Sequence, residues 1–194
     1  MYKNFLKRFL DFIVSLIVLL FFLPLFIIVY FLVKIDSKGD FFFFQDRLGK
    51  NGKIFKVYKI RTMTDKIRVA DREILKGDAE VTRVGGVLRR LKIDELPQII
   101  NIFKGDMSFV GPRPCLPSQI NEFNEDGKKR ILVRPGLTGL AQVNGNIYLT
   151  WEERWKYDRK YVENLTMILD MQITLKTFAI VIFGEEKYLK KPNA

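Results

Sequence analysis

The stretch FIVSLIVLLFFLPLFIIVYFLV, residues 12–33, decides how this chain folds, because none of its side chains is charged. A straight helix of this length would extend about 33 Å, enough to cross the hydrocarbon core of a bilayer. Pro24 lies near the middle, where proline removes a helix hydrogen bond and crowds the preceding turn. We therefore expect a membrane helix that bends at Pro24.

Basic residues flank this stretch on both sides, at Lys3, Lys7 and Arg8 before it and at Lys34 and Lys38 after it. Positive residues stay on the cytoplasmic side of a membrane, so a helix that enters and leaves by one face suits both flanks. We predict that residues 1–36 form a re-entrant helix hairpin broken at Pro24, which makes the protein monotopic on the cytoplasmic face of the inner membrane. A kinked span is the alternative. A signal peptide is disfavoured, because no small-x-small cleavage site follows.

The charge and composition of the chain narrow its chemistry. Lys and Arg total 33 against 22 acidic residues, and the net charge of +11 favours anionic partners such as phospholipid headgroups or phosphorylated molecules. The absence of histidine excludes Ser-His-Asp and Cys-His catalysis. A single cysteine, Cys115, excludes an internal disulfide. An enzyme of this composition must draw its nucleophile from carboxylates, Lys, Tyr, Ser, Cys or a metal-bound water.

Residues 37–194 are predicted to form an α+β, mainly helical domain on the cytosolic face. Residues 40–63 predict a small β-hairpin, since KNGK at 50–53 is a turn signal and the flanking segments are extended in character. Residues 105–117 and 134–145 are Gly- and Pro-rich and predict loops, and the charged, poorly periodic segment 64–80 predicts a mobile loop with a helical piece. Four helices are expected, the last two amphipathic and lying at the membrane interface around the active site: residues 81–92, 94–103, 151–164 and 168–183.

Asp94 and Glu95 are the candidates for the chemical centre. Adjacent acids at the start of a helix are usually capping residues, and we expect Asp94 to be an N-cap. The pair also follows a strongly basic stretch. Opposite charge and the helix dipole both favour the anion, so we expect an ionised carboxylate here. Without histidine, an ionised Asp is a plausible covalent nucleophile toward a phosphoryl group.

Arg113 is presented rigidly between Pro112 and Pro114. The planar guanidinium matches phosphate oxygens, so this position suits diphosphate binding, and a solvated surface loop is the alternative. The basic stretch 50–92 could also face nucleic acid, but no nucleic-acid-reading module or phosphate-binding glycine motif is present. The residues therefore indicate a membrane protein that handles phosphate and does not bind nucleic acid.

Three motifs carry a resemblance to a known family: KIDELPQ at residues 92–98, NIFKGDMSFVGPRP at 101–114 and RPGLTGLAQVNG at 134–145. Together they resemble the bacterial sugar transferases known as monotopic phosphoglycosyl transferases. The resemblance extends from the N-terminal Lys-Arg pair to about Phe183, and the layout is similar to that of the minimal, single-domain members, such as the transferase that initiates bacterial N-linked glycan assembly.

The resemblance implies a two-step reaction that begins glycan, O-antigen or capsule assembly. Asp94 would attack the β-phosphate of a UDP-sugar and release UMP, and undecaprenyl phosphate would then take the phosphosugar. Glu95 would help to hold Mg²⁺. Arg113 and Lys59 correspond to the family's phosphate contacts, and Arg89 and Gln142 to contacts on the nucleotide side.

Two positions depart from the family pattern. Asn146 stands where many members carry arginine, which leaves the sugar open between an N-acetylated sugar, favoured by the short architecture, and a hexose. Arg61 stands where close relatives often have lysine, a change that keeps the charge and is expected to matter little. A membrane-tethered basic scaffold without turnover is the alternative from another functional class.

Overall fold

The computed structural model describes residues 2–64 and 80–184. Within these ranges the chain is mainly helical with two small two-stranded sheets, which confirms the predicted fold class in its coarse form. The predicted loop at residues 64–80 lies almost wholly outside the described residues.

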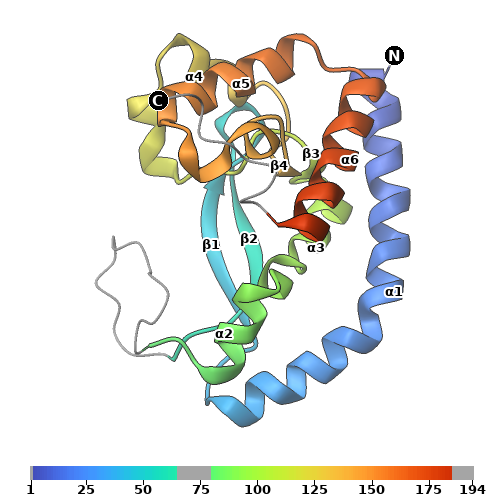
Figure 1. Ribbon diagram of the computed structural model, residues 1–194, viewed down its shortest axis with the longest axis vertical. Helices are drawn as coiled ribbons and strands as arrows, with labels where there is room; N and C mark the ends of the chain where they lie inside the picture. The colour runs from blue at the N-terminus through green and yellow to red at the C-terminus, as the bar shows by residue number, and fades with distance from the viewer. Residues whose placement is uncertain (1, 65–79, 185–194) are drawn as a thin grey trace.

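The helix α1 (Lys7–Asp36) follows a short π-helical turn, η1 (Tyr2–Leu6), and runs along one side of the molecule (Figure 1). Among the described residues it is the one helix long and apolar enough to cross a membrane. Pro24 lies inside α1, and the helix is continuous there although its ribbon bends (Figure 1). A hairpin broken at Pro24 is therefore not confirmed. A proline removes one hydrogen bond and kinks a helix, and the bonds on either side keep it helical.

The predicted β-hairpin is confirmed, and its turn is placed correctly. β1 (Phe42–Leu48) pairs antiparallel with β2 (Ile54–Ile60), and the turn η2 (Lys50–Gly52) joins them. Asn51 and Gly52 have φ values of 58° and 75°, the left-handed region that these two residue types tolerate best.

The segment after the hairpin contains α2 (Arg83–Arg90), the turn η3 (Ile93–Glu95) and α3 (Gln98–Lys104). The prediction of one helix over residues 94–103 with Asp94 as its N-cap is wrong. Asp94 and Glu95 lie in the 3₁₀ turn, and Pro97 occupies the N-cap position of α3. In a helix capped by Asp94, the N–H of residue 97 would be one that the Asp94 side chain accepts from, and Pro97 has no N–H to donate.

The two Gly- and Pro-rich segments were predicted as separate loops, and the structure pairs them. β3 (Ser108–Val110) and β4 (Gly136–Thr138) form a parallel ladder. Gly136 donates from its N–H to the Pro112 carbonyl at 2.9 Å, and a Cβ on Gly136 would lie 2.1 Å from the Gly111 nitrogen. Only glycine allows this approach of the two backbones.

The rest of the chain is helical and packs around this ladder. The last two predicted helices are confirmed as α5 (Trp151–Glu163) and α6 (Met167–Phe183), and α6 lies beside the first half of α1 (Figure 1). Tyr161 and Ile173 pack with Val110 in one core cluster. The remaining elements are short: α4 (Glu125–Arg130) and the 3₁₀ turns η4 (Pro117–Glu122), η5 (Gln142–Asn144) and η6 (Asn146–Tyr148).

Arg61 joins the end of α1 to the hairpin. Its buried guanidinium donates to the carbonyls of Ser37, at 2.8 Å, and Lys38. The planar fork of arginine reaches two acceptors at once, which the single ammonium of lysine does with different geometry.

Candidate active site

Three predicted residues from distant parts of the chain converge on one carboxylate oxygen. Glu95 Oε1, in η3, lies 2.9 Å from Lys59 Nζ of β2 and 3.0 Å from Arg113 Nη2 of the loop after β3. The side chains of Glu95 and Lys59 are 19% and 23% exposed, whereas that of Arg113 is 54% exposed, so the Arg113 side of this ion-pair cluster faces solvent. A cluster of two cations around one acid has a net positive charge, which suits a phosphate ligand.

The ionisation of Glu95 is set by these partners. Burial by itself would raise the pKa of its carboxyl, but the charges and hydrogen bonds of Arg113 and Lys59 outweigh burial and lower the pKa to about 2. Glu95 is therefore an anion at every physiological pH.

The pKa of the Asp94 carboxyl is shifted in the opposite direction to that of Glu95. Burial and the neighbouring charge of Glu95 raise the pKa of its carboxyl, while Lys59 and Arg89 oppose the shift. Nearby cations and a helix dipole were expected to favour the anion of Asp94. In the structure Lys59 and Arg113 pair with Glu95, and Asp94 lies in a 3₁₀ turn rather than at the start of an α-helix, so these effects do not outweigh burial and the charge of Glu95. A carboxylate with a raised pKa is the more basic of the two and the better suited to attack phosphorus.

Asn101 links α3, the helix that follows Glu95, to β2, the strand that carries Lys59. It is fully buried on α3, accepts from the Tyr58 N–H at 3.1 Å and donates to the Lys56 carbonyl at 2.8 Å. Sequence reasoning missed this role, because no local pattern separates a buried linking Asn from a surface one.

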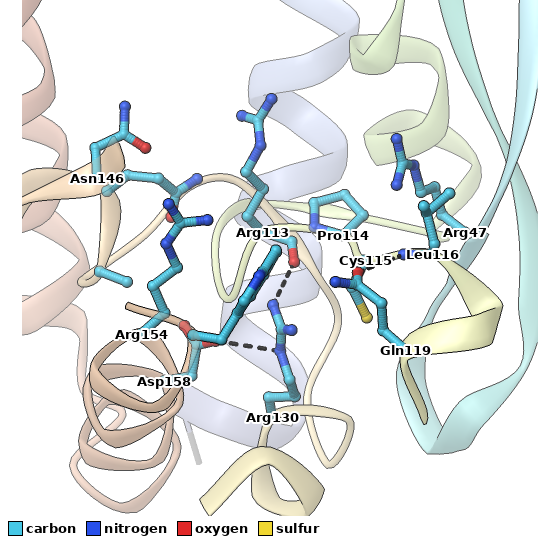
Figure 2. A pocket seen from close by; sticks show the side chains of 13 residues that line it. Arg47, Arg113, Pro114, Cys115, Leu116, Gln119, Arg130, Asn146, Arg154 and Asp158 are labelled. Carbon is cyan, nitrogen blue, oxygen red and sulfur yellow. Dashed lines mark hydrogen bonds and ion pairs between the residues drawn. The ribbon is translucent and has the colours of Figure 1, made fainter. Parts of the chain in front are cut away.

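A second buried pair supports Arg113 from behind. Arg130 Nη2 donates to the Arg113 carbonyl at 2.6 Å, and Arg130 Nε lies 3.1 Å from Asp158 Oδ2 of α5 (Figure 2). Arg130 and Asp158 are 6% and 2% exposed. Two prolines restrict the backbone of Arg113, and this pair anchors its carbonyl, so the side chain is presented from a fixed base.

A cavity of about 350 Å³ opens beside Arg113 (Figure 2). Gln142 lines it, whereas Arg89 does not and donates instead to Thr62 Oγ1 at 2.8 Å. The two predicted nucleotide-side residues therefore lie at different places. Sequence reasoning also missed three cavity arginines, which the fold brings in from β1, α4 and α5: Arg47, Arg130 and Arg154.

The donors present fit the magnesium ion that was expected. No group of three or more His, Cys, Asp or Glu side chains that could hold a metal occurs within residues 2–64 and 80–184. Mg²⁺ needs no such cage, since it commonly binds one or two carboxylates together with substrate phosphates and waters. Both ion pairs of Glu95 use Oε1, which leaves Oε2 and the adjacent Asp94 carboxylate as oxygen donors.

Comparison with known proteins adds independent information. The sequence profile described as "Bacterial sugar transferase" matches residues 2–184. The chain is 37% identical over 180 residues to the uncharacterised sugar transferase EpsL of Bacillus subtilis (strain 168), covering 93% of this chain and 89% of EpsL.

Two longer relatives have names that state an activity. Undecaprenyl-phosphate galactose phosphotransferase of Salmonella typhimurium is 34% identical over 202 residues, covering 96% of this chain and 42% of the relative. UDP-N-acetylgalactosamine-undecaprenyl-phosphate N-acetylgalactosaminephosphotransferase of Aeromonas hydrophila is 37% identical over 187 residues. The match covers 93% of this chain and 44% of the relative. The chain therefore spans less than half of each of these two.

Proposed function

This chain belongs to the bacterial sugar transferase family, and from that premise we propose that it transfers a sugar 1-phosphate from a UDP-sugar to undecaprenyl phosphate. The named activities of the Salmonella and Aeromonas relatives support this reaction class. The observation that carries the proposal is the cluster in which Glu95 holds Lys59 and Arg113 within 3.0 Å, directly beside Asp94. Such a site offers a nucleophile and the cations that a diphosphate requires.

In the first step, an Asp94 carboxylate oxygen forms a bond to the β-phosphorus of the UDP-sugar. The bond between that phosphorus and the bridging oxygen breaks, and UMP leaves with the electron pair. Arg113 and Lys59 stabilise the charge that develops on the phosphoryl oxygens. The product is a phosphosugar joined to Asp94 as an acyl phosphate, the mixed anhydride of the two acids.

In the second step, a phosphate oxygen of undecaprenyl phosphate attacks the same phosphorus. The bond to Asp94 breaks, and the carboxylate is regenerated. The lipid leaves as a polyprenyl-diphosphate sugar, the starting point for assembly of a glycoconjugate. No proton transfer by histidine is needed, in agreement with a chain that has none.

Glu95 would hold Mg²⁺ through Oε2, with Asp94 adjacent. When bound, the ion supplies positive charge that neutralises the diphosphate and favours departure of UMP. The role of Glu95 itself is to orient Lys59 and Arg113, and its low pKa keeps it charged for this purpose.

The membrane arrangement is part of the same proposal. Most side chains of α1 are exposed apolar groups, among them Leu20, Phe21 and Ile35, and they suit contact with lipid tails. We propose that α1 enters and leaves by the cytoplasmic face of the inner membrane, bending near Pro24. The catalytic residues would then meet the lipid-borne acceptor and the soluble donor at the same interface.

The test is UMP release by the purified full chain in lipid nanodiscs with Mg²⁺, undecaprenyl phosphate and a panel of UDP-sugars. The panel includes UDP-galactose and UDP-N-acetylgalactosamine, because relatives are named for both sugars. Intact mass measured without acceptor should show one phosphosugar adduct, absent in Asp94→Asn. The matched control is Asp126→Asn, which removes an acid of α4 that is paired with Arg159 of α5 and does not line the cavity.

The outcomes separate the competing functions. UMP release that persists in Asp94→Asn would overturn the nucleophile assignment. No release from any donor, by protein that is folded and lipid-bound, would instead favour a membrane-tethered scaffold.

A further inference from the structure

The basic residues that precede α1 are largely used inside the protein. Lys7 is paired with Asp170 at 2.6 Å, and Arg8 donates to the carbonyls of Ile102 and Phe103 at 2.6 and 2.7 Å. Their charges and donors are therefore already satisfied by protein acceptors. Cations that can serve a membrane headgroup have to be sought at the other end of α1.

The short helix α2 packs against that other end. Leu88 of α2 is buried together with Val29 and Val33 of α1, and the Val84 N–H donates to Asp36 Oδ2 at 2.9 Å. Figure 1 shows α2 beside the last turns of α1. If the apolar part of α1 lies in the hydrocarbon core, α2 is held at the level where the chain emerges through the headgroups.

The outward face of α2 combines cations with apolar groups. Arg83, Val87, Arg90 and Leu91 recur at spacings of three and four residues and are all exposed, Val87 to 45% and Leu91 to 58%. Neither Arg83 nor Arg90 forms a hydrogen bond or ion pair with any residue that the structure describes. Cations beside exposed apolar side chains are typical of a helix that lies in a membrane interface.

The end of α1 extends this cationic surface. Lys34 and Lys38 are exposed, and Lys34 Nζ lies 5.8 Å from the ring centre of Tyr30, a residue type that favours the headgroup level. Over residues 34–40 and 80–91, Asp40 is the one exposed acid, while Asp36 and Glu80 are partly buried. The exposed charge of this surface is therefore positive, which complements an anionic headgroup.

We infer that the outward face of α2 and the end of α1 bind the headgroups of anionic phospholipids. Arg83 and Arg90 donate to headgroup phosphates, and Val87 and Leu91 contact the first methylenes of the acyl chains. Each cation near an anionic membrane surface contributes about fivefold in affinity. A soluble acidic partner would leave the two apolar side chains in water. The inference rests on the membrane arrangement proposed above and adds a lipid class to it. Since α2 leads into η3, the bound lipid holds the segment that carries Asp94 at the membrane surface.

The experiment measures lipid selectivity by electron spin resonance on the full chain in phosphatidylcholine vesicles, without a UDP-sugar. Trace spin-labelled phosphatidylglycerol or phosphatidylcholine reports the fraction of each lipid whose motion the protein restricts. Wild type should restrict phosphatidylglycerol more than phosphatidylcholine, and the double variant Arg83→Gln with Arg90→Gln should lose this preference. Both arginines are exposed and without protein partners, so the fold should be retained.

The matched control removes two exposed cations elsewhere, by Lys128→Gln with Lys129→Gln on α4. That helix lies near the turn of the hairpin, whereas α2 lies near its open end, and the preference should persist.

Equal restriction of the two lipids by wild type would overturn this inference, as would a preference that survives in the arginine variant. Restriction of neither lipid would overturn it together with the proposed membrane arrangement. A preference that behaves as expected in protein that releases no UMP from any donor would leave this inference standing and count against the proposed reaction.

Discussion

Lys7 Nζ, at the start of α1, lies 2.6 Å from Asp170 Oδ2 on α6, and the two side chains are 12% and 9% exposed. Asp170 Oδ1 also lies 2.8 Å from the Tyr161 hydroxyl, which is 2.9 Å from the Val110 carbonyl as well, so the one hydroxyl proton is shared between these two acceptors. The first turn of the apolar helix is therefore bound to α5, α6 and the end of β3 through one carboxylate.

Loss of this carboxylate should destabilise the fold. Asp170→Ala leaves the Lys7 ammonium buried and unpaired, so we expect the free energy of unfolding to fall by about 3–5 kcal/mol. Denaturant unfolding of both proteins in the same detergent measures this free energy. Glu163→Gln, which removes an exposed pair with Arg159, should change stability by less than about 1 kcal/mol. Equal effects of the two variants would contradict the role given to Asp170.

The pH dependence of UMP release should report the ionisation of Asp94. Only the carboxylate attacks phosphorus, and burial and Glu95 raise its pKa, so the acidic limb of kcat/KM should lie above the ordinary Asp range. Lys59→Met removes a charge that lowers the Asp94 pKa and should move the limb to higher pH. Glu95→Gln removes a charge that raises it and should move the limb to lower pH. Shifts in the same direction for both variants would exclude Asp94 as the titrating group.

Glu95 should stabilise the protein in a defined pH range. Its carboxyl pKa is lowered from 4.5 to about 2 in the folded state. The unfolded chain therefore takes up protons first as the pH falls, and the contribution is complete above pH 4.5 and lost toward pH 2. Its upper limit is about 3 kcal/mol. Unfolding measured at pH 7 and near pH 3 should show Glu95→Gln less stable than wild type at the higher pH, with a smaller difference at the lower. A pH-independent difference would refute the ion-pair origin.

The parallel ladder of β3 and β4 should not tolerate a side chain at Gly136. Gly136→Ala would place its Cβ 2.1 Å from the Gly111 nitrogen and 2.5 Å from the Thr138 oxygen, so β3 and β4 must separate. We expect UMP release to fall at least about tenfold, because the base of Arg113 moves. Gly86→Ala on α2 is the matched control: nothing lies within 4 Å of its Cβ, and stability should rise by about 0.5–1 kcal/mol. Full activity of Gly136→Ala would show that the ladder does not position Arg113.

Local signals in the sequence were sufficient for much of the fold. The turn at Asn51 and Gly52 specified the hairpin, since only a few residue types accept its left-handed backbone. The helix α5 begins at a capping box of Thr150 and Glu153, whose spacing of three residues is a sequence signature of a helix start. These features depend on neighbours within a few residues, so sequence reasoning reaches them.

The sequence by itself thus determined the apolar helix, the hairpin and, through its motifs, the family and the candidates Asp94, Glu95, Lys59 and Arg113. Only the tertiary structure decided that the two glycine-rich loops pair, that Arg130 and Asp158 support Arg113, and that Asp94 has a raised pKa. The physical reason is that burial, ion pairing and backbone approach depend on residues far apart in the chain. Their energies arise only once the chain has packed.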